Sequence, residues 1–243
     1  MEEQLSPEDE FRRQTLIKLL TMGALTMSPL SALEAAWWGL KPQPIGQGKS
    51  IFSLEGEVRV NNKVADLNTR IQAGDSVRTG NNSEAVFVVG SDSFIMRSNS
   101  ELQIEGSHFL LDSIRLLSGG LLSVFGQRKS RQPLRMSTMT ATLGIRGTGV
   151  YMEAEPDLTY LCTCYGSVEL QSVQDPNDRQ IITTKHHDEP RYISDKEVKG
   201  SRIRKAPFIN HTDPELKMLE ALVGREVPFG LEADQYRSPR RDY

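Results

Sequence analysis

The feature that most constrains the fold is a succession of short β-prone runs across residues 50–200. Val, Ile, Phe, Tyr and Thr fill these runs, and Gly, Asn, Asp and Ser separate them at intervals of roughly ten residues, as in strands joined by tight turns. The run 85–89 is wholly apolar, as expected for a strand buried on both faces. Asn61 and Asn62 predict a hairpin turn, and the Ser-Gly-Gly sequence at 118–120 predicts a turn between two further strands. The pattern predicts an all-β domain built as a sandwich, a barrel or a short solenoid.

The composition excludes several classes of protein. Lys and Arg total 29 against 32 Asp and Glu, for a formal net charge of -3, whereas a nucleic-acid-binding chain normally carries a clear basic excess. We therefore expect no nucleic-acid partner. The 2 cysteines are too few for a disulfide-dense secreted scaffold.

The N-terminal segment has the character of an export signal. Arg12 and Arg13 precede an uncharged, largely apolar run at 19–33, which is shorter than the ~20 residues that span a bilayer. The paired arginines resemble the twin-arginine signal, which carries folded proteins across the bacterial cytoplasmic membrane, although Thr15 stands where that signal usually has an aromatic residue. We interpret residues 1–40 as an export signal or membrane anchor, with an amphipathic helix packed on the domain as the alternative. Export predicts a periplasmic protein, or one attached to the outer face of the cytoplasmic membrane through this segment.

Four motifs follow one another in the β-rich region: residues 56–60 (GEVRV), 74–80 (GDSVRTG), 98–102 (SNSEL) and 140–149 (TATLGIRGTG). In order and spacing they resemble the FecR domain of bacterial extracytoplasmic signalling proteins, over roughly residues 50–172. The resemblance implies an all-β domain that faces the periplasm and has a role in binding and relay. Full-length FecR regulators also carry a cytoplasmic sigma-factor-binding segment, and the roughly 18 residues before the apolar run are too few to fold as one. We therefore expect the binding role without the anti-sigma role.

Glycines cluster around Arg146, at Gly144, Gly147 and Gly149. Glycine inside a strand costs backbone entropy, so this cluster predicts a bulge or a corner where two backbones approach closely. The corner either presents Arg146 to a partner or is an ordinary sheet corner in which Arg146 caps carbonyl groups. On the first interpretation Arg78, Arg146, Gly147 and Gly149 bind a partner, which would be another envelope protein or a cell-wall polymer.

Two cysteines stand two residues apart, so on a strand the sulfurs of Cys162 and Cys164 project from one face. His186, His187 and His211 follow downstream. Two thiolates and two imidazoles suffice for tetrahedral zinc, and cysteine with histidine also suits iron or haem. These residues spread over about 50 positions, unlike the compact pairs of zinc fingers. A metal or haem site, a strained disulfide or redox pair, and two inert thiols with histidines in solvated turns or beside a helix all remain open.

The C-terminal extension, residues 201–243, contains a helix start. Residues 212–215 (TDPE) form a capping box with proline in the first turn, and leucines recur at helical spacing behind it. This pattern predicts one short amphipathic helix over about 213–223, packed on the sheet.

The sequence contains no nucleophile elbow, zinc-protease helix, phosphate loop or dinucleotide-binding glycine motif. We therefore predict a non-catalytic binding or signalling module of the cell envelope. A metal- or haem-binding periplasmic protein that uses the cysteines and histidines is the main alternative, and a periplasmic thiol redox protein is the third.

Overall fold

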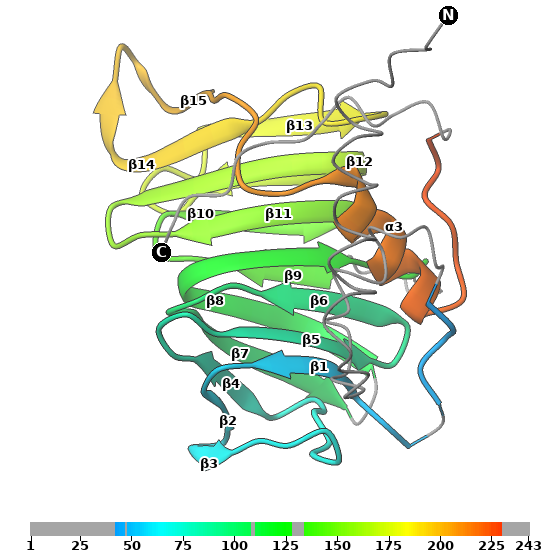
Figure 1. The fold of residues 1–243 in the computed structure, drawn as a ribbon. Coiled ribbons are helices and arrows are strands. Elements are labelled where there is room, and N and C mark those ends of the chain that lie inside the picture. The colour runs from blue at the N-terminus through cyan, green and yellow to red at the C-terminus, as the bar shows by residue number, and fades with distance from the viewer. Residues whose placement is uncertain (1–41, 47, 108–109, 128–133, 230–243) are drawn as a thin grey trace, which may run out of the picture. The chain divides into compact units, whose positions relative to one another are not determined.

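The computed structural model describes residues 42–46, 48–107, 110–127 and 134–229 (Figure 1). The predicted export signal or anchor at 1–40 lies outside these residues. Within them, strands predominate and a single short helix, α3 (Asp213–Leu222), is present, which confirms the mostly β class and the predicted C-terminal helix. No helix in the described part of the chain is long and apolar enough to cross a membrane.

The strands form two sheets. Sheet A is antiparallel throughout, and its strands are, in spatial order, β1 (Ile51–Glu55), β5 (Glu84–Val89), β6 (Asp92–Met96), β8 (Leu110–Val124), β11 (Gly149–Ala154), β12 (Leu158–Ser172), β14 (Arg191–Val198) and β15 (Ser201–Lys205). β15 lies within the predicted C-terminal extension and is paired with β14.

Sheet B shares β8 and β12 with sheet A. Its strands are, in spatial order, β3 (Lys63–Val64), β2 (Val58–Val60), β4 (Ser76–Thr79), β7 (Glu101–Ser107), β8, β9 (Leu134–Ser137), β10 (Ala141–Ile145), β12 and β13 (Arg179–Thr184). The turn predicted at Asn61 and Asn62 joins β2 to β3, and both asparagines have positive φ, which confirms the prediction. Among the described strands of this sheet, only β8 and β9 pair in parallel.

Glycines allow β8 and β12 to pass from one sheet to the other. β8 pairs with β7 of sheet B up to Ser118 and with β11 of sheet A from Gly119 onward. Gly119 has a φ of 79° and Gly166 of β12 a φ of 89°, a region that favours glycine. A Cβ on Gly166 would clash with Thr148. The prediction of a turn at 118–120 was wrong, because glycine at this position bends a continuous strand without ending it.

Apolar side chains cover both faces of sheet A. On β11, Val150 and Met152 point into the core between the two sheets, whereas Tyr151 points to the opposite face. β5 alternates in the same way, which confirms the prediction that this run is buried on both faces. α3 covers the second face of sheet A, where Leu216 and Leu219 join the second apolar cluster (Figure 1).

A buried ion-pair cluster fixes the start of α3. Arg97, which follows β6, donates to the carboxylates of Glu84 at 2.7 Å and Glu215 at 2.8 Å, and to the carbonyl oxygen of Asn210 at 3.2 Å. Burial opposes the charge on Arg97, but attraction from Glu215 and Glu84 raises its pKa above the usual value. The other Glu215 oxygen accepts the amide hydrogen of Thr212 at 2.9 Å, as expected for the predicted capping box. The segment that precedes α3 is therefore held in one place against sheet A.

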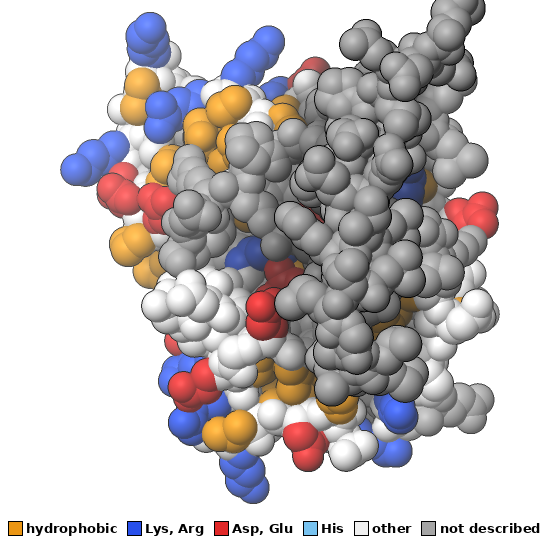
Figure 2. Space-filling model, in the orientation of Figure 1, with side chains coloured by type: hydrophobic (Ala, Val, Ile, Leu, Met, Phe, Trp, Pro, Cys, Tyr) orange, Lys and Arg blue, Asp and Glu red, His pale blue; other side chains and the backbone are white. Residues whose placement is uncertain are grey.

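Charged side chains of both signs are interspersed on the face shown in Figure 2. Basic residues at the edge of sheet A lie next to acidic ones, and the same mixing recurs at the opposite end of this face. The described surface on this side therefore carries no extended patch of a single charge.

Candidate metal centre

Cys162 and Cys164 lie in the half of β12 that belongs to sheet A. Side chains alternate along a strand, so the two sulfurs project from the same face, and both belong to the apolar cluster under α3. Both cysteines are free thiols and fully buried. A sheet packed on both faces thus places two thiols where water is excluded.

His187 reaches these thiols from the connection between β13 and β14. β13 pairs with β12 as far as Thr184, and the backbone N–H of His187 then donates to the carbonyl oxygen of Cys164 at 2.9 Å. A positive φ of 55° turns the chain at His187. The imidazole consequently points back over β12, and its Nδ1 lies 3.4 Å from Cys162 Sγ.

His211 approaches from the segment that enters α3. Its ring stacks on Tyr151 of β11, with 4.6 Å between the ring centroids, and its Nδ1 donates to the carbonyl oxygen of Ile209 at 2.7 Å. Because Asn210 and Glu215 are both tied to Arg97, the backbone on either side of His211 is fixed. Its Nε2 lies 3.1 Å from His187 Nδ1.

Four buried side chains therefore meet at one point. The ligand atoms of Cys162, Cys164, His187 and His211 all lie within 4.8 Å of one another, and each residue is at most 2% exposed. Tetrahedral zinc with ordinary Zn–S and Zn–N bonds requires about 3.3–3.8 Å between ligand atoms. The separations of 3.1 and 3.4 Å around His187 are close to these values. The four residues could therefore coordinate a single ion as a Cys2His2 set.

The outer hydrogen bonds determine which ring nitrogens can bind an ion. A carbonyl oxygen only accepts, so His211 Nδ1 carries hydrogen and a neutral His211 has its lone pair on Nε2. His187 Nε2 donates to Asp213 Oδ1 at 3.0 Å, which likewise leaves the lone pair of a neutral ring on Nδ1. These two nitrogens face each other at 3.1 Å, so a proton or a metal ion must lie between them. Fixing the ligating nitrogen through a hydrogen bond to the other one is common in zinc sites.

The electrostatics of the cluster favour one thiolate and one imidazolium when no metal is bound. Burial opposes ionisation of Cys162, but hydrogen bonds from Cys164, His187 and His211 and attraction to His211 hold its pKa well below the usual value. Burial and the neighbouring Cys162 raise the pKa of Cys164 well above the usual value. Burial also opposes a charge on His187, but Asp213 and Cys162 raise its pKa to about 9. The Cys162 thiol therefore loses its proton more readily than an ordinary cysteine, and the thiolate is the form that binds a metal ion.

Asp213 and His186 form an outer layer around this set. Asp213 is the first residue of α3, is fully buried, and accepts from both His187 and His186 through the same oxygen, at 3.0 and 2.9 Å. The His186 side chain is 18% exposed, and its ring packs on Phe229 at 4.3 Å between centroids. His186, His187 and Asp213 also constitute a second group of close metal-ligand atoms.

The structure brings together Cys162, Cys164, His187 and His211 of the predicted metal ligands and places His186 one step outward. Asp213 is not among the predicted ligands, and the sequence pattern indicates only its place in the capping box at 212–215. The signal that could have identified it is an aspartate two residues after a candidate histidine ligand, since imidazole ligands commonly donate to a carboxylate.

Of the residues predicted to bind a partner, Arg78 lies apart from the other three, which are together at the turn between β10 and β11. Arg78 lies on β4 of sheet B and is paired with Glu101 at 2.6 Å, whereas Arg146 is exposed in the turn between β10 and β11. Gly147 has a φ of 60°, as a corner requires. Gly149 provides close packing, because a Cβ there would lie 2.5 Å from the ring of Tyr165.

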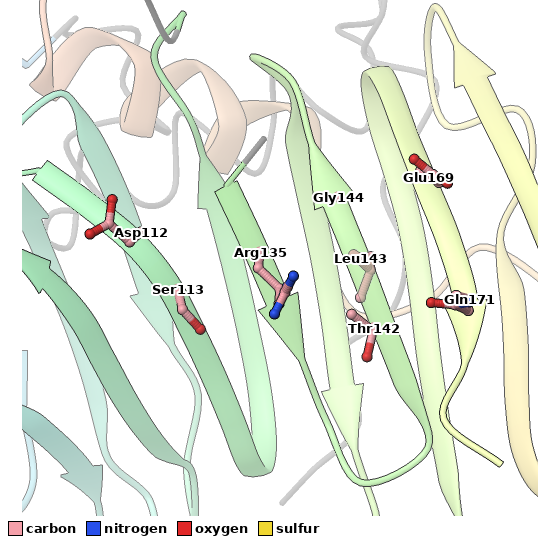
Figure 3. A pocket seen from close by; sticks show the side chains of 8 residues that line it. All are labelled: Asp112, Ser113, Arg135, Thr142, Leu143, Gly144, Glu169 and Gln171. Carbon is pink, nitrogen blue, oxygen red and sulfur yellow. The ribbon is translucent and has the colours of Figure 1, made fainter. Parts of the chain in front are cut away.

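Sheet B has a separate hollow of about 570 Å³ on its outer face (Figure 3). In the strand register Gly144 lies between Arg135 on β9 and Glu169 on β12, so a position without a side chain separates two opposite charges. Neither Arg135 nor Glu169 has an ion-pair partner among the residues that the structure describes. The rest of the hollow is lined by Asp112, Ser113, Thr142, Leu143 and Gln171.

Comparison with known proteins gives a partial structural likeness. No protein-family model matches the chain, and no curated protein matches it. Two solved structures, at 1.65 and 2.50 Å resolution, of a protein described as "a putative anti-sigma factor" from Parabacteroides distasonis resemble it with a TM-score of 0.44 and 11% identity. The match covers 54% of this chain and 58% of the other, so the chain spans little more than half the length of the protein it resembles.

Proposed function

We propose that this protein binds one zinc ion through Cys162, Cys164, His187 and His211. The observation that carries the proposal is the convergence of four buried ligand atoms, supplied by three separate segments of the chain, within 4.8 Å. Two thiolates neutralise a divalent cation, so the loaded centre would have no net charge in its apolar surroundings. Sulfur and nitrogen donors in tetrahedral arrangement favour zinc.

The arrangement disfavours the other cofactors considered for these residues. A haem needs a flat slot beside its axial ligands, whereas these four donors converge on a point. In a two-iron cluster of the Rieske type the cysteines and histidines bind different irons. Such a cluster would separate the two kinds of ligand, but Cys162 Sγ lies 3.4 Å from His187 Nδ1.

We propose a structural rather than catalytic ion. Four protein ligands complete a tetrahedral coordination shell and leave no position for water or substrate, as in structural zinc sites. The ligands come from β12, from the connection between β13 and β14, and from the segment before α3. The ion would therefore fasten the C-terminal segment to sheet A.

Metal analysis of the purified protein tests this proposal. We expect close to one zinc per chain in the wild type and little or none in the Cys162→Ser/Cys164→Ser variant. Thr163→Ser is the matched control, because it changes the same strand on its opposite face and should retain the zinc. His211→Ala provides a second ligand variant if the cysteine variant does not fold. A wild-type protein without metal, or full zinc content in a folded ligand variant, would overturn the proposal.

A second candidate is a FecR-like binding module of the cell envelope, exported to the periplasm. The hollow on sheet B favours it, because Arg135 and Glu169, which have no ion-pair partner among the described residues, stand on either side of Gly144 and could bind opposite charges of a partner. A cell-wall polymer with ammonium and carboxylate groups has the complementary chemistry. This role is non-catalytic and is compatible with the zinc centre, which lies on the other sheet.

Co-sedimentation with purified cell-wall sacculi tests the second candidate. We expect the wild type to sediment with the sacculi and the Arg135→Ala/Glu169→Ala variant to remain in solution. The control is Arg59→Ala/Glu57→Ala, which removes an exposed pair elsewhere on the surface. Equal sedimentation of all three proteins would exclude this hollow as the binding site.

A further inference from the structure

We propose that His186 and Asp213 form a loading site that captures a divalent metal ion at the surface and passes it to the buried cysteines and histidines. This inference rests on the proposed zinc centre and concerns how that centre is filled. The four proposed ligands are at most 2% exposed, so an ion in solution cannot reach them directly. A neighbouring group that binds the ion between the surface and the buried ligands would provide a route inward.

The position of His186 suits this role. Its side chain is 18% exposed, while the side chains of Asp213 and His187 next to it are fully buried. His186 Nε2 and His187 Nε2 lie 2.9 and 3.0 Å from the same oxygen of Asp213. One carboxylate thus contacts both the outer imidazole and an imidazole of the buried set.

The second oxygen of Asp213 gives an independent indication of a ligand. Asp213 Oδ2 is buried and has no hydrogen-bond partner in the described part of the chain. A buried carboxylate oxygen without a partner is costly, and a cation beside it would remove that cost. The ligand atoms of His186 and Asp213 lie close enough to share one ion, and the neighbouring His187 also belongs to the buried group.

The charges of the two ligand sets indicate that the outer group binds the ion only transiently. In the buried set, two thiolates balance the two charges of a divalent ion. The outer group offers a single carboxylate and imidazoles, a weaker set for the same ion. An ion captured at His186 would therefore move inward to the cysteines.

Stopped-flow mixing with Co²⁺ tests the proposal, because thiolate-to-cobalt charge-transfer absorption reports arrival at the cysteines. The variant is His186→Phe, which retains an aromatic ring against Phe229 and removes both ring nitrogens. We expect loading to slow several-fold, because capture of the ion at the surface is lost. Release to an excess of chelator should slow by a similar factor, so the equilibrium affinity should change much less than either rate. A loading site lowers the barrier in both directions, whereas a ligand of the final centre would change the affinity.

Lys185→Ala is the matched control, since it changes the exposed neighbour in the same turn and should load at the wild-type rate. His186→Ala distinguishes capture from obstruction, because faster loading in this variant would mean that His186 merely blocks the route. Unchanged loading in His186→Phe, or a loss of affinity at an unchanged loading rate, would also overturn the inference. If the wild type never develops cobalt-thiolate absorption, the proposal of the zinc centre is wrong, and the proposal of the loading site is wrong with it.

Discussion

At the scale of single residues, the decisive feature is the pair of imidazoles whose ring nitrogens face each other beside two thiols. Ile209 and Asp213 each accept a hydrogen bond from one of these rings, and so direct the remaining nitrogens of His211 and His187 toward the same point. Chain connectivity does not require the two ring nitrogens to point toward the same place, because His187 and His211 lie on different segments. It is the arrangement expected when second-layer groups orient metal ligands.

Asp213 is therefore expected to influence zinc affinity without contacting the bound ion in its final position. Asp213→Asn removes the negative charge that favours the ligating tautomer of His187, and we expect zinc affinity to fall by about 10- to 100-fold. Competition with a chromophoric chelator measures this change. Asp157→Asn, in an exposed turn before β12, is the control and should retain wild-type affinity. Equal zinc affinity in the two variants would show that Asp213 does not influence zinc binding.

Zinc binding is expected to release protons. The pKa of Cys164 is raised well above its usual value and that of His187 to about 9, so both groups are protonated near neutral pH in the metal-free protein. Zinc requires both to be deprotonated, whereas the pKa of Cys162 is held well below its usual value, so this thiol gives up its proton more readily. Binding at pH 7 should therefore release about two protons. Affinity should rise with pH through the pKa of His187 and continue to rise above it, because Cys164 is still protonated there.

Calorimetry in two buffers with different ionisation enthalpies measures this proton release. A binding enthalpy that is the same in both buffers, with an affinity that does not change between about pH 6 and pH 8, would contradict the assigned protonation states.

Part of this site could be predicted from sequence and part could not. Cys162 and Cys164 are two residues apart in a β-prone run, so strand geometry alone places both sulfurs on one face. The approach of His187 depends on the register of β13 against β12, and that of His211 depends on where α3 packs. Residue spacing does not encode those distances, which is why the metal site remained one interpretation among three.

At the scale of elements, the two long strands β8 and β12 join the sheets. Each bends where glycine with positive φ replaces a side chain, at Gly119 and Gly166. The sequence shows glycine at both positions but does not distinguish a bent strand from a turn. Pairing partners on both sides of the bend make that distinction, and for β8 one of them, β11, is separated from it in the chain by β9 and β10.

Gly166→Ala is expected to destabilise the protein strongly. Its positive φ is unfavourable for alanine, and the new methyl group would clash with Thr148, so we expect a loss of about 2–4 kcal/mol in the free energy of unfolding. Gly147→Ala is the matched control, because Gly147 also has positive φ but its Cβ would lie 3.6 Å from Gln127 Cγ. There we expect only the conformational cost of about 1–2 kcal/mol.

Denaturant unfolding of both variants measures the difference. Two losses of equal size would mean that close packing at the bend of β12 contributes nothing.

At the scale of the whole β domain, two kinds of interaction hold α3 and the segment before it on sheet A. Apolar contacts of Leu216 and Leu219 and the ion pairs of Arg97 act without any metal. The proposed zinc ion would add a third interaction, through its bonds to His211 and His187. The fold therefore does not depend on the ion alone, in contrast to a small zinc finger.

Removal of zinc is expected to lower stability without unfolding the protein. A ligand that binds only the folded state stabilises it by about 4 kcal/mol when its concentration is 1,000 times its dissociation constant. Chelation should therefore lower the melting temperature of the wild type, and far-UV circular dichroism should still report strands. The Cys162→Ser/Cys164→Ser variant should melt at the same temperature with and without chelator. A wild type that is insensitive to chelation would contradict a stabilising ion.

The most direct test of the central claim is the zinc-edge X-ray absorption spectrum of the purified protein. The account predicts two sulfur neighbours at about 2.3 Å and two imidazole nitrogens at about 2.0–2.1 Å. A shell of oxygen and nitrogen atoms without sulfur would show that any bound zinc lies elsewhere, and would contradict the assignment of Cys162, Cys164, His187 and His211 as its ligands.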